Sequence, residues 1–98
     1  MSIESLYPLV SEAIRRAEQL EDLGAPEACS AYLEVSRIEE RIAELLPASD
    51  AEGALARDSA VQAALAAGDQ TRAEELAARF AAEQRAARRP EAEGLYCR

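Results

Sequence analysis

Acidic side chains are the largest set of groups in this sequence that could do chemistry. The 98 residues include 19 Asp and Glu against 11 positive side chains, all of them Arg, and there is no His. The acids gather in two clusters: Glu18, Glu21 and Asp22, then Glu39, Glu40 and Glu44. Inward-facing carboxylates of a helical bundle can hold two metal ions, but such sites use Glu-x-x-His pairs. These acids also lie mostly outside the apolar positions, so we expect a solvated face, without a metal or a cofactor.

The absence of His and Lys removes most catalytic arrangements. A Ser–His–Asp triad, a Cys–His dyad, a Schiff-base lysine and a Walker lysine each need one of these residues. A carboxylate acid–base pair needs one desolvated member with a raised pKa, and nothing in the sequence pattern singles one out. The glycines at positions 24, 53, 68 and 94 form no phosphate-binding loop. We therefore predict that the chain is not an enzyme.

The two cysteines do not form a recognisable motif. Cys29 and Cys97 are too distant for a CxxC pair and match no zinc spacing. Cys29 falls among apolar residues of a predicted helix, where a buried, reduced thiol is expected. For Cys97, near the C-terminus, the sequence leaves open a disulfide with a second copy. A signal peptide and an apolar run of about 18 residues are both missing, so we expect a cytoplasmic protein that does not enter a membrane.

Tyrosines and a group of arginines are the remaining candidates for specific contacts. Tyr combines a large apolar area with a polar tip and is enriched at interfaces. Tyr32, beside the apolar stripe of a predicted helix, also fits the edge of the core. Four arginines between residues 79 and 89 fit cation placement at a helix C-terminus, with contact to an anion or an acidic partner as the alternative. The candidate interaction residues are Tyr7, Tyr32, Leu33, Phe80, Arg85 and Arg88.

Apolar residues recur at helical spacing in four segments, and no run alternates as a strand would. We expect helices over about residues 6–23, 26–46, 50–67 and 70–89. The second of these has the most regular apolar stripe: Ala28, Ala31, Val35, Ile38, Ile42 and Leu45. The third has few large apolar residues and many alanines, which favour a helix but bury little area at each contact.

Residue types at the helix ends support these boundaries. Ser5 is a suitable N-cap for the first helix and would place Pro8 in the first turn, while Pro26 suits the first position of the second helix. Ser49 and Glu52 form a capping-box pattern before the third helix. Asp69 can cap the fourth helix.

Glycine and proline mark the expected stops. Gly24 and Gly68 can end helices because glycine enters the left-handed conformation at little cost, and Pro47 and Pro90 end the other two. The short connections make consecutive helices antiparallel neighbours. The predicted fold is all-α: a small antiparallel bundle of about four helices, arranged as two helical hairpins with a thin, Ala-rich core. Residues 1–90 would form a single domain and residues 91–98 a C-terminal tail.

The two predicted hairpins resemble each other weakly. Residues 64–73 look like the turn and second-helix start of a tetratricopeptide repeat, in which a small residue five positions after the glycine lets two helices approach. The likeness covers about ten residues. The earlier aromatic and glycine positions of that repeat are not matched by Ala60, Val61 and Ala64. The sequence therefore assigns no family and leaves open whether the hairpins are a true repeat.

The composition suggests a need for a partner. Alanine accounts for 23 residues, so four helices share few larger apolar side chains. A partner or a second copy could cover a face that the Ala-rich helices leave incomplete. We therefore expect a non-catalytic protein–protein interaction module: an adaptor, a regulator or a chaperone-like subunit that binds another protein or itself.

The charge supports an alternative function. The net charge is −8, which disfavours direct binding to nucleic acid or to an anionic membrane. The same charge would suit an acidic inhibitor or decoy that occupies the basic surface of a nucleic-acid-binding protein. Partners released steeply by salt would favour this alternative.

Overall fold

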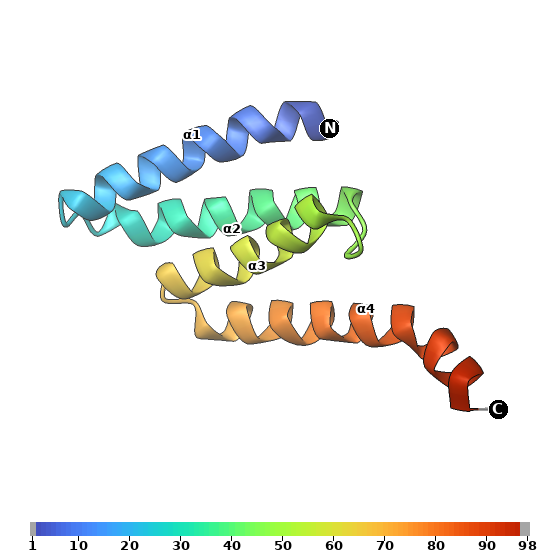
Figure 1. Ribbon diagram of the computed structural model, residues 1–98. Helices are drawn as coiled ribbons and strands as arrows, with labels where there is room; N and C mark the ends of the chain where they lie inside the picture. Colours follow the sequence, from blue (N-terminus) through green and yellow to red (C-terminus); the bar gives the residue numbers. More distant parts are fainter. Residues whose placement is uncertain (1, 97–98) are drawn as a thin grey trace.

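The computed structural model describes the backbone of residues 2–96 and the side chains of residues 2–86. Residues 2–96 form four helices and no strand: α1 (Ile3–Asp22), α2 (Glu27–Leu45), α3 (Ala51–Ala66) and α4 (Gln70–Tyr96). Consecutive helices run antiparallel and pack against each other (Figure 1). The predicted all-α bundle of two helical hairpins is confirmed.

The same turn closes both hairpins. Gly24 has a φ of 67° and Gly68 a φ of 78°, in the left-handed region that favours glycine. In each turn the glycine amide donates to the carbonyl three residues earlier, and the next amide donates to the carbonyl five residues earlier. These two hydrogen bonds define a Schellman motif. The prediction that these glycines end their helices is therefore confirmed.

Two predicted helix starts are wrong. Ser2, rather than Ser5, caps α1, and its side chain accepts a hydrogen bond from the Ser5 amide. Pro8 consequently lies beyond the first turn, where it removes only its own bond to the carbonyl of Glu4. Both Pro8 and Glu4 are exposed, so water can satisfy that carbonyl. Local cap chemistry at Ser2 therefore outweighs the missing proline bond.

The third helix also begins differently from the prediction. Asp50, rather than Ser49, caps α3, because its carboxylate accepts hydrogen bonds from the amides of Glu52 and Gly53. A carboxylate at this position also complements the positive end of the helix dipole. The predicted cap of α4 is confirmed, since the Arg72 amide donates to Asp69 at 3.0 Å.

The last helix is longer than predicted. α4 passes through Pro90 and ends at Tyr96, so the expected stop at Arg89 is wrong. Figure 1 shows the final turns of α4 bending away from its earlier axis. A proline inside a helix is a known cause of such a bend. The division into a domain of residues 1–90 and a tail of residues 91–98 stays a prediction.

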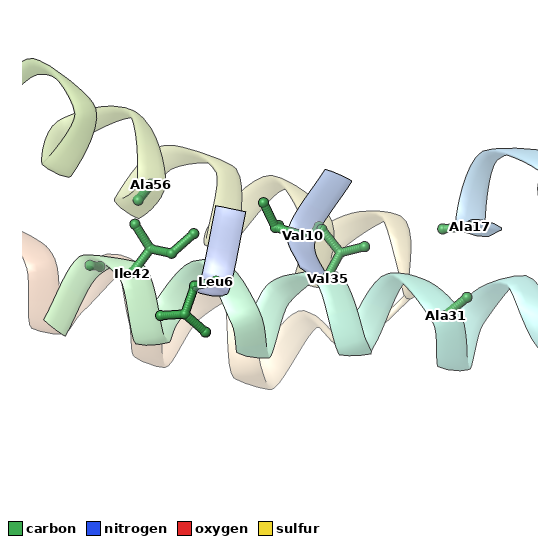
Figure 2. Close-up of a cluster of buried hydrophobic side chains, with 9 residues drawn as sticks. Leu6, Val10, Ala17, Ala31, Val35, Ile42 and Ala56 are labelled. Carbon is green, nitrogen blue, oxygen red and sulfur yellow. The ribbon is translucent and has the colours of Figure 1, made fainter. Parts of the chain in front are cut away.

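The core is built from small side chains. Among the side chains of residues 2–86, eight of the thirteen buried hydrophobic residues are alanines, which matches the thin core expected from the sequence. Four larger side chains come together where α1 and α2 meet. Figure 2 shows Leu6 and Val10 of α1 beside Val35 and Ile42 of α2, with Ala56 of α3 nearby. Each alanine contact buries little area, so close approach must supply part of the stability.

The closest approach is between the turn after α2 and the start of α3. A Cβ atom added to Gly53 would lie 2.1 Å from the carbonyl oxygen of Pro47. That oxygen belongs to the backbone and cannot swing aside as a side chain would. Gly53 is therefore required by packing, even though its φ is not left-handed.

A buried serine connects three helices. Ser36 of α2 is fully buried, and its hydroxyl donates to the carbonyl of Ala60 in α3 at 2.7 Å. The same oxygen accepts a hydrogen bond from Nε of Arg72 in α4 at 3.0 Å. Arg72 and Arg79 also pair with Glu40 of α2, at 2.8 and 2.6 Å. Burial raises the pKa of Glu40, but hydrogen bonds from Arg79 and Arg72 outweigh it and lower the pKa overall.

Arg57 makes a second connection, one turn earlier in α3. Its guanidinium donates to Glu83 and to the carbonyls of Leu46 and Gly53, each at 2.9 Å. It also lies 5.5 Å from the ring centre of Phe80, within range of a cation–π contact. Nε and Nη1 of this buried arginine therefore both donate hydrogen bonds inside the fold.

We predict that Gly53→Ala destabilises the protein by about 2 kcal/mol, because the new methyl group overlaps a backbone oxygen. In an open helix the same change would add about 1 kcal/mol of stability. Urea unfolding followed by circular dichroism measures the difference. Ala54→Gly, at the next, exposed position, is the control and should cost about 1 kcal/mol. A gain in stability for Gly53→Ala would contradict the close approach.

We also predict that Ser36→Ala costs about 1–3 kcal/mol, because it removes a hydrogen bond to Ala60 and the acceptor for Arg72. The matched control is Ser30→Ala, an exposed position of the same helix, with an expected change within about 0.5 kcal/mol. Thermal and urea unfolding both report the effect. Equal stability of the two variants would show that the buried hydroxyl does not join the helices.

Candidate functional site

Two hollows lie side by side between α1 and α3, with α2 as their floor. The first, about 180 Å³, lies between Tyr7 of α1 and Leu55 of α3. The second, about 280 Å³, lies between Ile14 of α1 and the last turns of α3. Glu39 of α2 and Ser59 of α3 line both hollows, so the two are adjacent. We call the pair the α1/α3 groove.

Glu39 occupies the middle of this groove. Only 8% of its surface is exposed, and it is the one buried acidic residue among the side chains of residues 2–86. Burial raises the pKa of its carboxyl group. Among the same side chains no ion pair or hydrogen bond holds it. A partly desolvated carboxylate is therefore left without a compensating charge, although its oxygens keep some contact with solvent, and the lost hydration costs free energy.

Four arginines of α1, α3 and α4 are bound elsewhere. Arg57 is held by Glu83 and two carbonyls, while Arg72 and Arg79 are held by Glu40 on the side of α2 that faces α4. Arg15 of α1 pairs with Glu12 in its own helix. None of these four cations is placed to neutralise Glu39.

Tyr7 and Tyr32 line the two hollows. The Tyr7 hydroxyl donates to Glu52, and the Tyr32 hydroxyl donates to Glu21 at 2.7 Å. These hydrogen bonds, followed by desolvation and nearby carboxylates, raise the pKa of each tyrosine to about 12. Both hydroxyls thus form hydrogen bonds with acidic residues at the groove edges. These bonds hold the two rings in place as parts of the groove walls.

The other candidate residues lie outside the groove. Leu33 is half-buried on α2 and does not line it. Phe80 lines a separate hollow of about 270 Å³ between α3 and α4, and the guanidinium groups of Arg57 and Arg79 lie over its ring. Arg85 is exposed on α4, and the Arg88 side chain lies outside the described residues.

Sequence reasoning missed Glu39. The expectation of a solvated acidic face fits Glu44, which is exposed, but is wrong for Glu39, which α3 covers. A usable signal was present: Val35, Glu39 and Ile42 are spaced as one helical stripe, with the acid between two apolar residues.

The prediction for Cys29 is also wrong. Its thiol is exposed, at the third residue of α2. The thiol therefore belongs neither to the core nor to the groove.

The geometry limits the chemistry of the site. In the described residues, no group of three or more acidic or cysteine side chains is arranged to hold a metal ion. An apolar groove with one carboxylate at its centre is suited to a non-covalent contact with an apolar surface that carries a positive charge.

Over the described part of the chain, none of the helices has both the length and the apolar character needed to cross a bilayer. Charged residues interrupt every helix, as in α2, where Glu39 and Glu40 follow Arg37 closely.

We predict that Glu39→Gln makes the protein more stable than wild type at pH 7, because it removes a charge that burial disfavours. With a folded-state pKa above the unfolded value, the folded wild type takes up its proton first as the pH falls. The free energy of unfolding of the wild type therefore rises relative to that of the variant as the pH falls. The difference between the two proteins should vanish as the pH approaches 4.5, the ordinary pKa of a glutamate side chain. Urea unfolding at a series of pH values measures this.

The control for this experiment is Glu34→Gln, which removes one negative charge from an exposed position of the same helix. It corrects for the change in net charge. A Glu39→Gln protein that is less stable than wild type at pH 7 would mean that the carboxylate makes a favourable contact inside the fold.

Comparison with known proteins does not assign a function to the chain. No protein-family model matches the chain, and no curated protein and no solved structure matches it. The function must therefore be inferred from the groove, its charge and its exposed apolar rim. Fold alone would not decide it, because small helical bundles serve many purposes.

Proposed function

We propose that the protein is a non-catalytic protein–protein interaction module that binds its partner in the α1/α3 groove. The observation that carries this proposal is Glu39, a buried carboxylate with no compensating charge between two apolar hollows. A residue that weakens the isolated fold is retained most simply where it contributes to binding.

The rim of the groove supports a macromolecular partner. Leu55 is 63% exposed and Tyr7 is 37% exposed, so apolar surface borders the hollow at the α1 and α3 sides. A single exposed apolar side chain is common on protein surfaces, but Tyr7 and Leu55 flank the same hollow. A partner that covered both side chains would gain free energy from burying their apolar area.

The proposal differs from the acidic decoy in where the charge acts. A decoy works through the total charge of −8, so removal of any exposed acid should weaken it about equally. An interaction module depends on the groove, and acids elsewhere matter little. Substitutions inside and outside the groove therefore separate the two functions.

We place this function in the cytoplasm. The exposed thiol of Cys29 supports that location, because thiols stay reduced there. An oxidising compartment would favour disulfide formation by such an exposed thiol. The partner is accordingly expected among proteins of the same compartment.

We predict that Leu55→Ala lowers retention of the partner about tenfold, because burying a leucine side chain contributes about 1.5–3 kcal/mol. The experiment is affinity capture from an extract of the native host, with bound proteins quantified by mass spectrometry. Leu65→Ala is the matched control: it is an exposed leucine of the same helix, 43% accessible, that lies outside the groove. It should retain the partner as wild type does.

The outcomes are distinct. Equal retention by both leucine variants would place the interface elsewhere and contradict the proposal. Failure to retain any protein, together with a monomeric mass by light scattering at all concentrations, would contradict an interaction function altogether. Equal loss with Glu34→Gln and Glu39→Gln would favour the acidic decoy.

A further inference from the structure

We infer that the α1/α3 groove receives an amphipathic α-helix of the partner, whose single Arg or Lys pairs with Glu39 while an apolar residue on each side enters one hollow. This inference rests on the proposed function and specifies the chemistry of the partner. Its starting point is the juxtaposition of Glu39 with the two hollows that share it.

A helical partner follows from the walls of the groove. Both walls and the floor are helices, whose backbone amides and carbonyls are already bonded within α1, α2 and α3. An extended peptide adds to a sheet edge, and residues 2–96 contain no strand that could offer one. Its backbone polar groups would be left unbonded against apolar side chains, whereas a helix satisfies its own.

A basic residue follows from the charges that face the groove. Near Tyr7 these are Glu52, Asp50 and Glu39, and each of them raises the pKa of that tyrosine. Near Tyr32 they are Glu21, Glu18 and Asp22. The groove is therefore negative along its length, and a cation that reaches Glu39 would meet a carboxylate that has lost part of its water.

The spacing on the floor sets the spacing in the partner. Val35, Glu39 and Ile42 of α2 lie four and three residues apart, so the apolar–acid–apolar stripe spans about 10 Å. A partner helix that matches it carries apolar residues about seven positions apart, with the basic residue at the third or fourth position between them. Arginine fits best, because its planar group can bond both carboxylate oxygens.

The test uses a synthetic peptide of about 18 residues, Ala- and Gln-rich, with Leu, Arg and Leu at positions i, i+4 and i+7. The comparison peptide has Gln in place of Arg, and a third peptide has the same composition in scrambled order. Binding to the full chain is measured by isothermal titration calorimetry, and helix formation by circular dichroism. The first peptide should bind and gain helix, the Gln peptide about tenfold more weakly.

A double-mutant cycle locates the contact. Glu39→Gln should weaken binding of the Arg peptide about tenfold and leave binding of the Gln peptide unchanged. Glu34→Gln, with the same change in net charge, should leave the affinity for both peptides unchanged. Because Glu39→Gln is expected to stabilise the fold, its melting curve shows that loss of binding is not loss of structure.

Several results would overturn the inference. Equal binding of the Arg and Gln peptides, equal loss with Glu34→Gln and Glu39→Gln, or equal binding of the scrambled peptide would each exclude a cation held by Glu39. A wild-type dimer that dissociates when a peptide is added would identify a second copy as the occupant. If no peptide binds while capture still depends on Leu55, the helix–cation pairing fails and the interaction function stands; if capture is also independent of Leu55, both fail.

Discussion

The close crossing of α2 and α3 is the constraint from which the other features of the protein follow. Gly53 provides room for the carbonyl of Pro47, and small residues such as Ala56 and Ala60 keep the two helices near each other along α3. This closeness lets Ser36 reach the Ala60 carbonyl and brings α3 over Glu39. The same contact that holds the fold together therefore buries most of the Glu39 side chain at the centre of the groove.

Hydrogen-bonded polar side chains complement a core that alanine makes thin. An alanine methyl contributes little transfer free energy, so the interior gains less from burial than a leucine-rich bundle does. Ser36, Arg72 and Glu40 connect α2 to α4, which is not its neighbour along the chain. Polar satisfaction is nearly complete in this network, whereas Glu39 stands apart from it. That contrast separates the residues that serve the structure from the one suited to binding.

Local chemistry decided how much of this could be predicted from the sequence. Helix number, pairing and the two glycine turns depend on short-range periodicity and on conformations that only glycine adopts easily, and these predictions were correct. Caps competed at neighbouring positions, so the starts near Ser2 and Asp50 were missed. The position of Glu39 between Val35 and Ile42 indicated burial, but whether α3 covers that position depends on the tertiary fold. Tyr7 and Tyr32 were chosen as generic interface residues, and only the fold places both along one groove.

Packing between chain neighbours has a consequence for how the molecule reaches its native state. Over residues 2–96, close backbone contacts join α1 to α2, α2 to α3 and α3 to α4, and helices further apart in the chain meet through side chains. Such a topology has low contact order, and each step closes only a short loop. Helical chains of this kind fold on the order of microseconds to milliseconds. The chain can therefore assemble hairpin by hairpin, with the α2–α3 crossing as the step that joins the halves.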